Sequence, residues 1–253
     1  MRVMSRILIL KTGETAVEVQ RTDGDYDRWF TDAMSSHPLQ FDVCDITRAD
    51  LTLPPDCCGV IVTGSPKAAY RHEPWMERLG SFLRESDQHR VPLLGVCFGA
   101  QILAMARGGR VILNPEGWEI GGARIELTAA GGDDPLFAGL PRKFGALTTH
   151  EDRIERLPEG AILLASNASS PVQAFRLGES TWGVQFHPEA TPNIIETLIR
   201  LRSDRFSRDA VEHGRDPNGH LDRLVETARD PSALQGRTVL DNFARLCVER
   251  NSR

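Results

Sequence analysis

The sequence predicts an α/β fold in which helices flank an open, mostly parallel sheet, and a mixed or antiparallel extension enlarges that sheet. Over the first hundred residues, short apolar runs alternate with amphipathic stretches, a pattern typical of parallel strands covered by helices. After about Arg110 the apolar runs follow one another with only short turns between them, which favours antiparallel pairing. The 253 residues are enough for one large α/β domain or two small ones.

Predicted strands and helices alternate in the first half of the chain, and Gly, Pro or Asp residues bound the strands. Between Pro74 and His89, apolar side chains recur on one helical face. Another helix is predicted from the end of the strand at Val96 through Ala106, and the glycine pair that follows it marks its end. The predicted strands are Arg6–Leu10, Phe41–Ile46, Gly59–Thr63 and Leu93–Val96, and the remaining predicted helix is Tyr26–Met34.

The second half contains six further predicted strands, and the part after Thr191 is predicted to be helical. We expect residues 1–200 to form one domain and residues 201–253 to form a helical extension packed on the same domain. The polar stretch Ser207–Gly219 lacks a clear hydrophobic pattern and is interpreted as a loop. The strands are Arg110–Leu113, Ala123–Thr128, Phe144–Thr148, Ala161–Ser166, Val172–Leu177 and Thr181–Phe186, and the helices are Asn193–Phe206, Leu221–Arg229 and Leu234–Arg250.

The composition argues against several classes of protein. The formal net charge is −5 and the two signs are mixed along the chain, which argues against a nucleic-acid-binding or membrane-surface protein. The longest apolar stretch, Val91 to Ala106, is interrupted by Pro92 and Gln101, so no membrane span is predicted. The N-terminal apolar run is too short for a signal peptide. The five cysteines show no repeated spacing, which favours a reducing cytoplasmic location.

No metal site and no cofactor are predicted. Cys57 and Cys58 are adjacent, and no second Cys/His pair stands at the spacing of zinc ligands. The chain contains neither a Gly-x-x-x-x-Gly-Lys-Ser/Thr phosphate loop nor a Gly-x-Gly-x-x-Gly dinucleotide turn. We therefore do not expect it to activate an acceptor molecule by itself. Four cysteines are interpreted as small buried hydrophobic residues: Cys44, Cys57, Cys58 and Cys247.

A candidate nucleophile stands where an apolar strand meets a helix. The strand runs into Gly95-x-Cys97-x-Gly99, the cysteine form of the Gly-x-Ser-x-Gly nucleophile elbow. The glycines leave room for a sharp turn that pushes Cys97 out of the sheet. The N-terminus of the helix that follows favours the thiolate over the thiol. The N–H of Phe98 is expected to face the carbonyl oxygen of a bound substrate.

A candidate base lies at the end of the predicted strand Thr181–Phe186. His187 follows this strand directly, and Glu189 stands two residues later, where its carboxylate can fix the imidazole tautomer. A thiolate that attacks an amide needs such a partner, because the departing amine must be protonated. Sites in open α/β sheets gather at the carboxyl ends of strands. We therefore expect Cys97 and His187 to meet there.

The two motifs together resemble the class I, triad-type glutamine amidotransferases. They read Gly-Val-Cys-Phe-Gly-Ala-Gln at 95–101 and Gly-Val-Gln-Phe-His-Pro-Glu at 183–189, and the resemblance covers about residues 6–197. It implies a class I glutamine amidotransferase-like, flavodoxin-like fold. It also implies a catalytic triad in which Cys97 is the nucleophile, His187 the base and Glu189 its orienter, with a γ-glutamyl thioester as the intermediate.

The resemblance implies further site residues. The segment 62–66 occupies the place of the family's Gly-Gly-Pro oxyanion loop, so a backbone N–H of Gly64 or Ser65 is expected beside that of Phe98. The segment Thr-His-Glu-Asp at 149–152 matches the family's Ser-His-x-Asp, and the glutamine after the elbow matches a residue that faces the same substrate. The residues expected to hold the glutamyl group are Gln101, Thr149, His150 and Asp152.

The segment Asn114–Gly121 narrows the resemblance to stand-alone proteins similar to the glutaminase domain of GMP synthase, a group that includes γ-glutamyl peptidases. The leading hypothesis is hydrolysis of the side-chain amide of glutamine, with ammonia supplied to a synthetase partner. The alternative is a stand-alone γ-glutamyl peptidase or hydrolase, which uses the same triad on a different leaving group. A catalytically silent binding homologue and a Cys-His peptidase are the remaining alternatives. No nucleic-acid or membrane partner is expected, and a homo-oligomer is left open.

Overall fold

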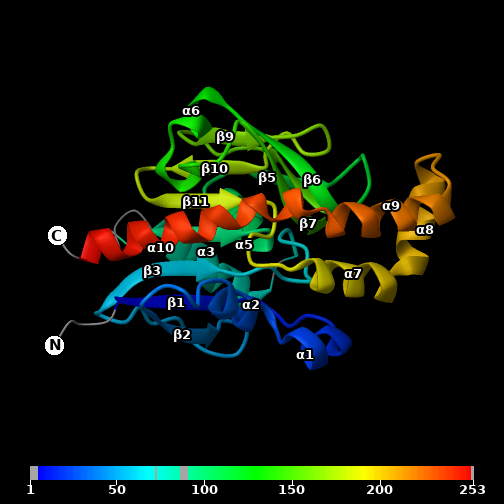
Figure 1. Cartoon of the computed structure of the whole chain (residues 1–253). Coiled ribbons are helices and arrows are strands. Elements are labelled where there is room, and N and C mark those ends of the chain that lie inside the picture. Colours follow the sequence, from blue (N-terminus) through cyan, green and yellow to red (C-terminus); the bar gives the residue numbers. More distant parts are fainter. Residues whose placement is uncertain (1–4, 72, 86–90, 252–253) are drawn as a thin grey trace.

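The computed structural model describes residues 5–71, 73–85 and 91–251. Within these residues, nine strands form one sheet in the order β2-β1-β3-β4-β11-β10-β9-β6-β7 (Figure 1). These strands are β1 (Ser5–Lys11), β2 (Leu39–Asp45), β3 (Cys57–Val62), β4 (Leu93–Val96), β6 (Glu119–Leu127), β7 (Lys143–His150), β9 (Ile162–Ser166), β10 (Ala174–Leu177) and β11 (Thr181–Val184).

The two halves of the sheet differ in strand direction. Strands β2, β1, β3, β4 and β11 run parallel, whereas β10, β9, β6 and β7 continue the sheet in antiparallel pairs. The predicted α/β fold with its antiparallel extension is therefore confirmed. β11 lies beside β4 with Val184 opposite Val96. The carboxyl ends of these two strands thus meet at one edge of the sheet.

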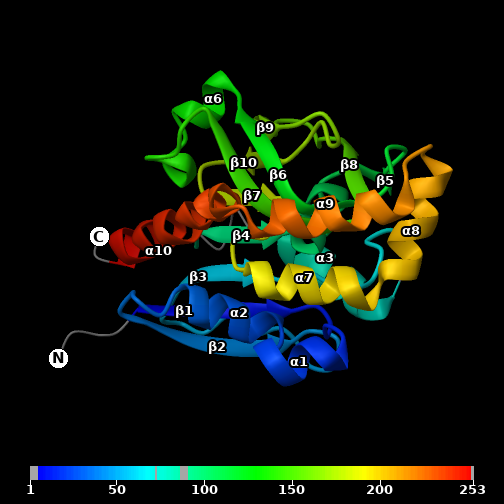
Figure 2. The same cartoon turned by 45° about the vertical axis from the view of Figure 1, so that its right-hand side comes forward.

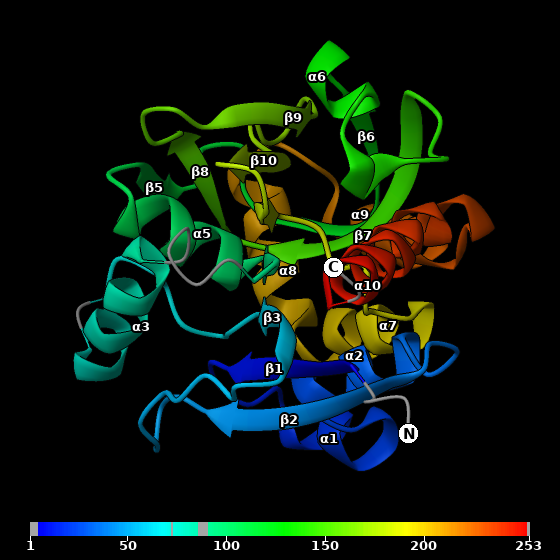
Figure 3. The same ribbon diagram turned by 90° about the vertical axis from the view of Figure 1, so that its left-hand side faces the viewer.

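Helices cover both faces of the parallel half, and the alternation of side chains along each strand explains why. In β1, Ile7 and Ile9 belong to the core beneath α2 and α10, whereas Leu8 and Leu10 belong to the core beneath α3 and α5. Figure 3 shows α3 and α5 on one side of the sheet and α10 on the other. The helices in this part of the chain are α1 (Val17–Asp23), α2 (Tyr26–Ala33), α3 (Pro74–Arg84) and α5 (Phe98–Ala106); α6 (Ala129–Gly132) and the 3-10 helix η1 (Pro135–Phe137) follow in the antiparallel half.

The C-terminal helices pass along the face opposite α3 and α5 (Figure 2). Phe206 and Ala228 pack with Ile120 and Leu147 of the antiparallel half, and Phe243 belongs to the main core. These helices are α7 (Pro192–Leu201), α8 (Ser203–Glu212), α9 (Pro217–Arg229), the 3-10 helix η2 (Pro231–Arg237) and α10 (Thr238–Asn251). None of the helices in the described ranges combines the length and apolarity of a bilayer-crossing segment.

Four predicted features need correction. The strand at Arg110–Leu113 exists as β5, but it pairs with β8 (Asp152–Arg156) in a separate two-stranded sheet, and β8 was not predicted. Helix α1 was not predicted either. The loop predicted at Ser207–Gly219 is wrong, because α8 extends to Glu212 and α9 begins at Pro217. The helix predicted to His89 ends at Arg84, and residues 86–90 lie outside the described part of the chain.

Candidate active site

Cys97 occupies the turn between β4 and α5 in a strained conformation. Its φ of 51° makes it the one non-glycine residue with positive φ among the described residues, and such a conformation is costly for an L-amino acid. A Cβ on Gly95 would stand 2.6 Å from the backbone of Gly99, and a Cβ on Gly99 would stand 2.3 Å from the carbonyl oxygen of Val62. Both glycines are therefore required for the turn and for the close approach of α5 to β3.

The sulfur of Cys97 has two weak polar neighbours. Gln185 Nε2 lies 3.7 Å from Sγ, and the carbonyl oxygen of Thr149 lies 3.9 Å from it. The backbone N–H of Cys97 donates to the carbonyl oxygen of Val184, 2.8 Å away. The turn is thus fixed against the end of β11, while Sγ lies at the N-terminus of α5, where a negative charge is stabilised.

His187 and Glu189 form a buried pair just beyond β11. His187 Nδ1 lies 2.6 Å from Glu189 Oε1, and the side chains are 3% and 0% exposed. Burial lowers the pKa of His187, but the charges of Glu189 and Cys97 raise it more strongly, so this pKa lies well above its ordinary value. Nε2 makes no hydrogen bond of ordinary geometry with a described residue. The ring therefore keeps one nitrogen for the sulfur or the substrate.

Gly64 marks the point where the predicted groups converge. A Cβ on this residue would stand 3.1 Å from His187 Cε1, 3.5 Å from Tyr26 Cε1 and 3.9 Å from Cys97 Cβ. The structure thus brings together the end of β3, the end of β4 and the end of β11. Glycine leaves this space open beside the sulfur.

The loop after β3 is held in place by Thr12. Thr12 Oγ1 donates to the carbonyl oxygen of Gly64 at 2.8 Å, and Ser65 Oγ donates to the carbonyl oxygen of Thr12 at 2.8 Å. The side chain of Ser65 is therefore occupied within the loop. Within the described residues, no acceptor is bound by the backbone N–H groups of Gly64, Ser65 or Phe98. These three N–H groups remain available to a ligand oxygen.

A cavity of about 470 Å³ opens from Cys97 and His187. Gln101 Nε2 donates to the carbonyl oxygen of Asp152 at 3.0 Å and to Gln185 Oε1 at 3.3 Å. Asp152 Oδ1 accepts from the hydroxyl of Tyr70 at 3.0 Å, and burial raises the pKa of this carboxyl group. All four residues expected to hold the glutamyl group line the cavity: Gln101, Thr149, His150 and Asp152.

His150 differs from the other three because its ring is engaged within the protein. Nδ1 lies 3.0 Å from the carbonyl oxygen of Asp152, and Nε2 lies 3.0 Å from Glu119 Oε2, at ion-pair distance but outside hydrogen-bond geometry. Glu119 also accepts from Asn167 Nδ2 at 2.5 Å and Gln173 Nε2 at 2.9 Å. Burial raises the pKa of Glu119, but the contacts with His150, Asn167 and Ser170 together outweigh this effect and lower it. Glu119 thus fixes His150, a role that local sequence reasoning missed.

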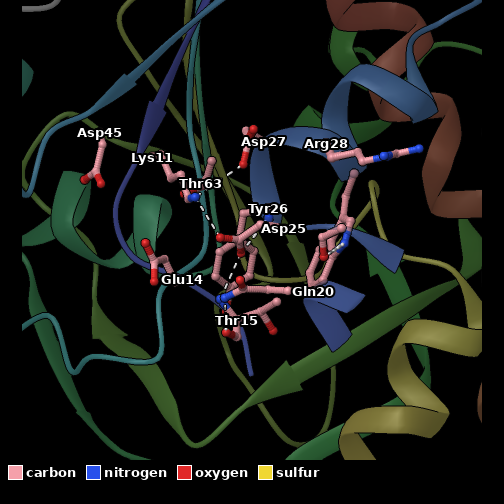
Figure 4. A network of polar contacts seen from close by, with 12 residues as sticks. Lys11, Glu14, Thr15, Gln20, Asp25, Tyr26, Asp27, Arg28, Asp45 and Thr63 are labelled. Carbon is pink, nitrogen blue, oxygen red and sulfur yellow. Dashed lines mark hydrogen bonds and ion pairs between the residues drawn. The ribbon is translucent and has the colours of Figure 1, made fainter. Parts of the chain in front are cut away.

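Tyr26 was also missed, and its position depends on a polar network at the start of α2. Asp25 Oδ1 accepts from the backbone N–H of Tyr26 at 2.9 Å and of Thr15 at 2.8 Å. Lys11 Nζ lies 2.7 Å from Asp25 Oδ2 and 3.5 Å from Asp27, as Figure 4 shows. This capped helix start holds the Tyr26 ring against Gly64.

The family model of class-I glutamine amidotransferases matches residues 24–200. Because this match spans more than half of the 253 residues, the chain belongs to that family, and the resemblance stated from the two motifs is confirmed. A solved glutamine amidotransferase from Thermotoga maritima shares the fold, with a TM-score of 0.74 at 23% identity over 96% of this chain and 98% of that one.

Two curated relatives represent different members of the family. The glutamine-hydrolysing GMP synthase of Thermosipho melanesiensis is 40% identical over 163 residues, which are 60% of this chain and 30% of that protein. γ-Glutamyl peptidase 3 of Arabidopsis thaliana is 27% identical over 190 residues, which are 72% of this chain and 75% of that protein. The matched segment thus spans less than a third of the GMP synthase but three quarters of the peptidase.

Proposed function

We propose that this chain hydrolyses the γ-amide of glutamine or of a related γ-glutamyl compound, with Cys97, His187 and Glu189 as its catalytic triad. The observation that carries the proposal is the strained turn of Cys97, which shares the space beside Gly64 with the imidazole of His187, whose Nδ1 lies 2.6 Å from Glu189 Oε1. A protonated His187 and a thiolate at Cys97 form a reactive pair without a separate activation step.

In the first half of the reaction, Cys97 Sγ attacks the γ-carbonyl carbon. The negative charge moves to the carbonyl oxygen, where the N–H of Phe98 and a backbone N–H of Gly64 or Ser65 stabilise it. The C–N bond then breaks, and the leaving nitrogen takes the proton of His187. The products of this half are a free amine or ammonia and a γ-glutamyl thioester on Cys97.

In the second half, water attacks the thioester carbon and passes a proton to His187. The C–S bond breaks, glutamate leaves, and the pair of charged groups is restored. Glu189 keeps Nδ1 protonated and directs Nε2 toward the reacting atoms. It therefore stabilises charge without transferring the proton itself.

We assign the glutamyl end of the substrate to the side of the cavity formed by α5, β7 and β8. Gln101, Thr149 and Asp152 would contact it directly. His150 contributes in a different way, because both of its ring nitrogens already face protein oxygens. Its function is to hold the backbone of the 149–152 segment in place.

The destination of the released amine separates two versions of this function. An ammonia-accepting synthetase partner fits the likeness to GMP synthase. A stand-alone hydrolase of γ-glutamyl amides fits the likeness to γ-glutamyl peptidase 3, which extends over three quarters of that protein. We favour turnover without a partner.

Steady-state kinetics on the purified chain test the proposal. Glutamine, γ-glutamyl amino acids and γ-glutamyl alkylamines are compared, with glutamate and amine release both measured. We expect turnover of at least one γ-glutamyl amide and its loss in Cys97→Ala and His187→Ala. Negligible turnover of the whole panel, with recovery after addition of a co-purifying ATP-dependent enzyme, would replace the stand-alone version with the partner-dependent one. An active Cys97→Ala variant would refute the mechanism.

A further inference from the structure

The junction between α7 and α8 forms a positively charged wall of the active-site cavity. Arg202 and Arg205 both line this cavity, together with Trp118. The guanidinium carbons lie 6.0 Å and 4.7 Å from the centroid of the Trp118 ring. Trp118 in turn packs edge-on against Phe206, with ring centroids 5.2 Å apart. Two arginines are therefore held beside an ordered aromatic surface.

The two arginines differ in how their charge is balanced. Arg205 Nη2 lies 2.5 Å from Glu151 Oε2. Arg202 has no carboxylate at ion-pair distance and no side-chain hydrogen bond within residues 5–71, 73–85 and 91–251. Burial lowers the pKa of Arg202, and the charge of Arg205 adds to this effect, whereas the charges of Tyr26 and Glu151 oppose it only in part. A partly buried cation without a counterion is unfavourable, and an anionic group on a ligand would remove that penalty.

Tyr26 places Arg202 on the side of the cavity near His187. The Tyr26 ring and the His187 ring lie within 3.5 Å of the same point above Gly64. Burial is the main cause that raises the pKa of Tyr26; the charge of Cys97 adds to it, and the charge of Arg202 opposes it. Tyr26 also packs in one apolar cluster with Leu198 of α7, one helical turn before Arg202, and all three residues line the cavity together with His187. The glutamyl half-site proposed above belongs to α5, β7 and β8, and the arginine wall meets it at the Arg205–Glu151 pair.

We propose that Arg202 binds a carboxylate in the leaving-group half of the substrate, so that the preferred substrates are γ-glutamyl amino acids or short γ-glutamyl peptides. This inference rests on the proposed γ-glutamyl hydrolysis. His187 must face the leaving amine to protonate it, so a group near His187 contacts the part of the substrate beyond the scissile bond. The planar guanidinium matches a carboxylate with two parallel hydrogen bonds.

Calorimetric binding to the Cys97→Ala variant of this chain tests the inference without turnover. The ligands are γ-glutamylglycine, its neutral counterpart γ-glutamylglycinamide, and glutamine. A charge-assisted hydrogen bond contributes roughly 1.5–3 kcal/mol, so we expect γ-glutamylglycine to bind about 10- to 100-fold more tightly than the glycinamide. Arg202→Gln in the same background should remove that difference and leave glutamine binding unchanged.

Arg200→Gln is the matched control. Arg200 stands two residues earlier, pairs with Glu196 and lines a different groove, so its replacement should keep the preference for the carboxylate. Equal affinity for the two glycine ligands would overturn the proposal. The proposal would also be overturned if Arg202→Gln lost affinity for glutamine as strongly as for γ-glutamylglycine, because Arg202 would then bind the α-carboxylate of the glutamyl group. If Arg202→Gln does not fold, equal affinity of the two glycine ligands for the chain with intact Arg202 would still overturn the proposal.

Turnover by the chain with intact Cys97 is measured separately. Carboxylate-dependent binding without any turnover would contradict the proposed reaction and support the binding role of Arg202. Turnover with no preference between the two glycine ligands would support the proposed reaction and contradict the binding role of Arg202. The two proposals therefore fail in different measurements.

Discussion

At the scale of single residues, Cys97 combines strain with close packing. A non-glycine residue in such a backbone conformation costs about 1–3 kcal/mol, and the neighbouring structure must enforce it. Gly95 and Gly99 do so by allowing backbone contacts that no side chain would permit. The hydrogen bond from Cys97 N–H to Val184 ties the turn to β11. The strain thus holds the sulfur beside the residues that follow β11.

Replacing Glu189 by Gln should move the pH dependence of activity. The charge of Glu189 raises the pKa of His187, so its removal lowers that pKa. The alkaline limb of kcat/KM, where His187 loses its proton, should then shift to lower pH. We also expect kcat to fall about 10²- to 10⁴-fold, less than for His187→Ala. A pH–rate profile of both variants is the measurement.

Glu189→Gln should also change how the free energy of unfolding depends on pH. A folded-state pKa above the unfolded value contributes stability that is fully present below about pH 6.5 and is lost as the pH rises through the raised pKa. The unmodified chain should therefore lose more unfolding free energy toward alkaline pH than Glu189→Gln, as urea titrations would show. An unmoved alkaline limb together with equal pH-dependent losses would contradict a charged pair.

Residues in local motifs could be predicted from the sequence, whereas residues that act across the fold could not. Cys97 was found because its turn needs glycines at fixed spacing, and His187 because it directly follows a strand. Glu119, Tyr26 and Arg202 offered no such signal, since each depends on partners far along the chain. Arg202 in particular looks like any surface arginine until α7 and α8 place it in the cavity.

At the scale of elements, the sequence predicted buried strands better than polar helices. β4 reads Leu-Leu-Gly-Val and β11 reads Thr-Trp-Gly-Val, mostly apolar runs of the kind found in buried parallel strands. The predicted helix Asn193–Phe206 covered α7 and only the start of α8. The rest of α8 was missed because few of its residues are apolar, and Phe206 and Ala210 supply much of its buried surface. β8 was missed because it pairs only with β5, outside the main sheet, so one face of it needs few apolar side chains.

The C-terminal helix α10 should contribute strongly to stability. Phe243 is fully buried in the main core, and a Phe→Ala change at such a position costs about 3–5 kcal/mol. Glu249 on the same helix is exposed, so Glu249→Ala should change stability by no more than about 0.5 kcal/mol. Urea unfolding of both variants tests this. A loss below about 1 kcal/mol for Phe243→Ala would show that the tail is not part of the same domain.

At the scale of the whole molecule, each part of the fold supplies one part of the site. The parallel half carries the proposed nucleophile and the proposed oxyanion loop, and β11 leads into His187 and Glu189. The antiparallel half carries Thr149 and His150 of β7, and the C-terminal helices carry Arg202. Sites in α/β proteins lie at the carboxyl ends of parallel strands, so the contribution of the parallel half could be predicted. The contribution of the C-terminal helices depends on their packing, which no local pattern predicts.

Covalent labelling tests the central claim most directly, namely that Cys97 is the nucleophile. The reagent is a glutamine analogue in which a chloromethyl ketone replaces the side-chain amide, and its adduct is located by intact mass and peptide mapping. We expect one adduct per chain, on Cys97, with protection by excess γ-glutamyl substrate and no adduct in Cys97→Ala. Modification of Cys44 or Cys57 with Cys97 unmodified would contradict the account.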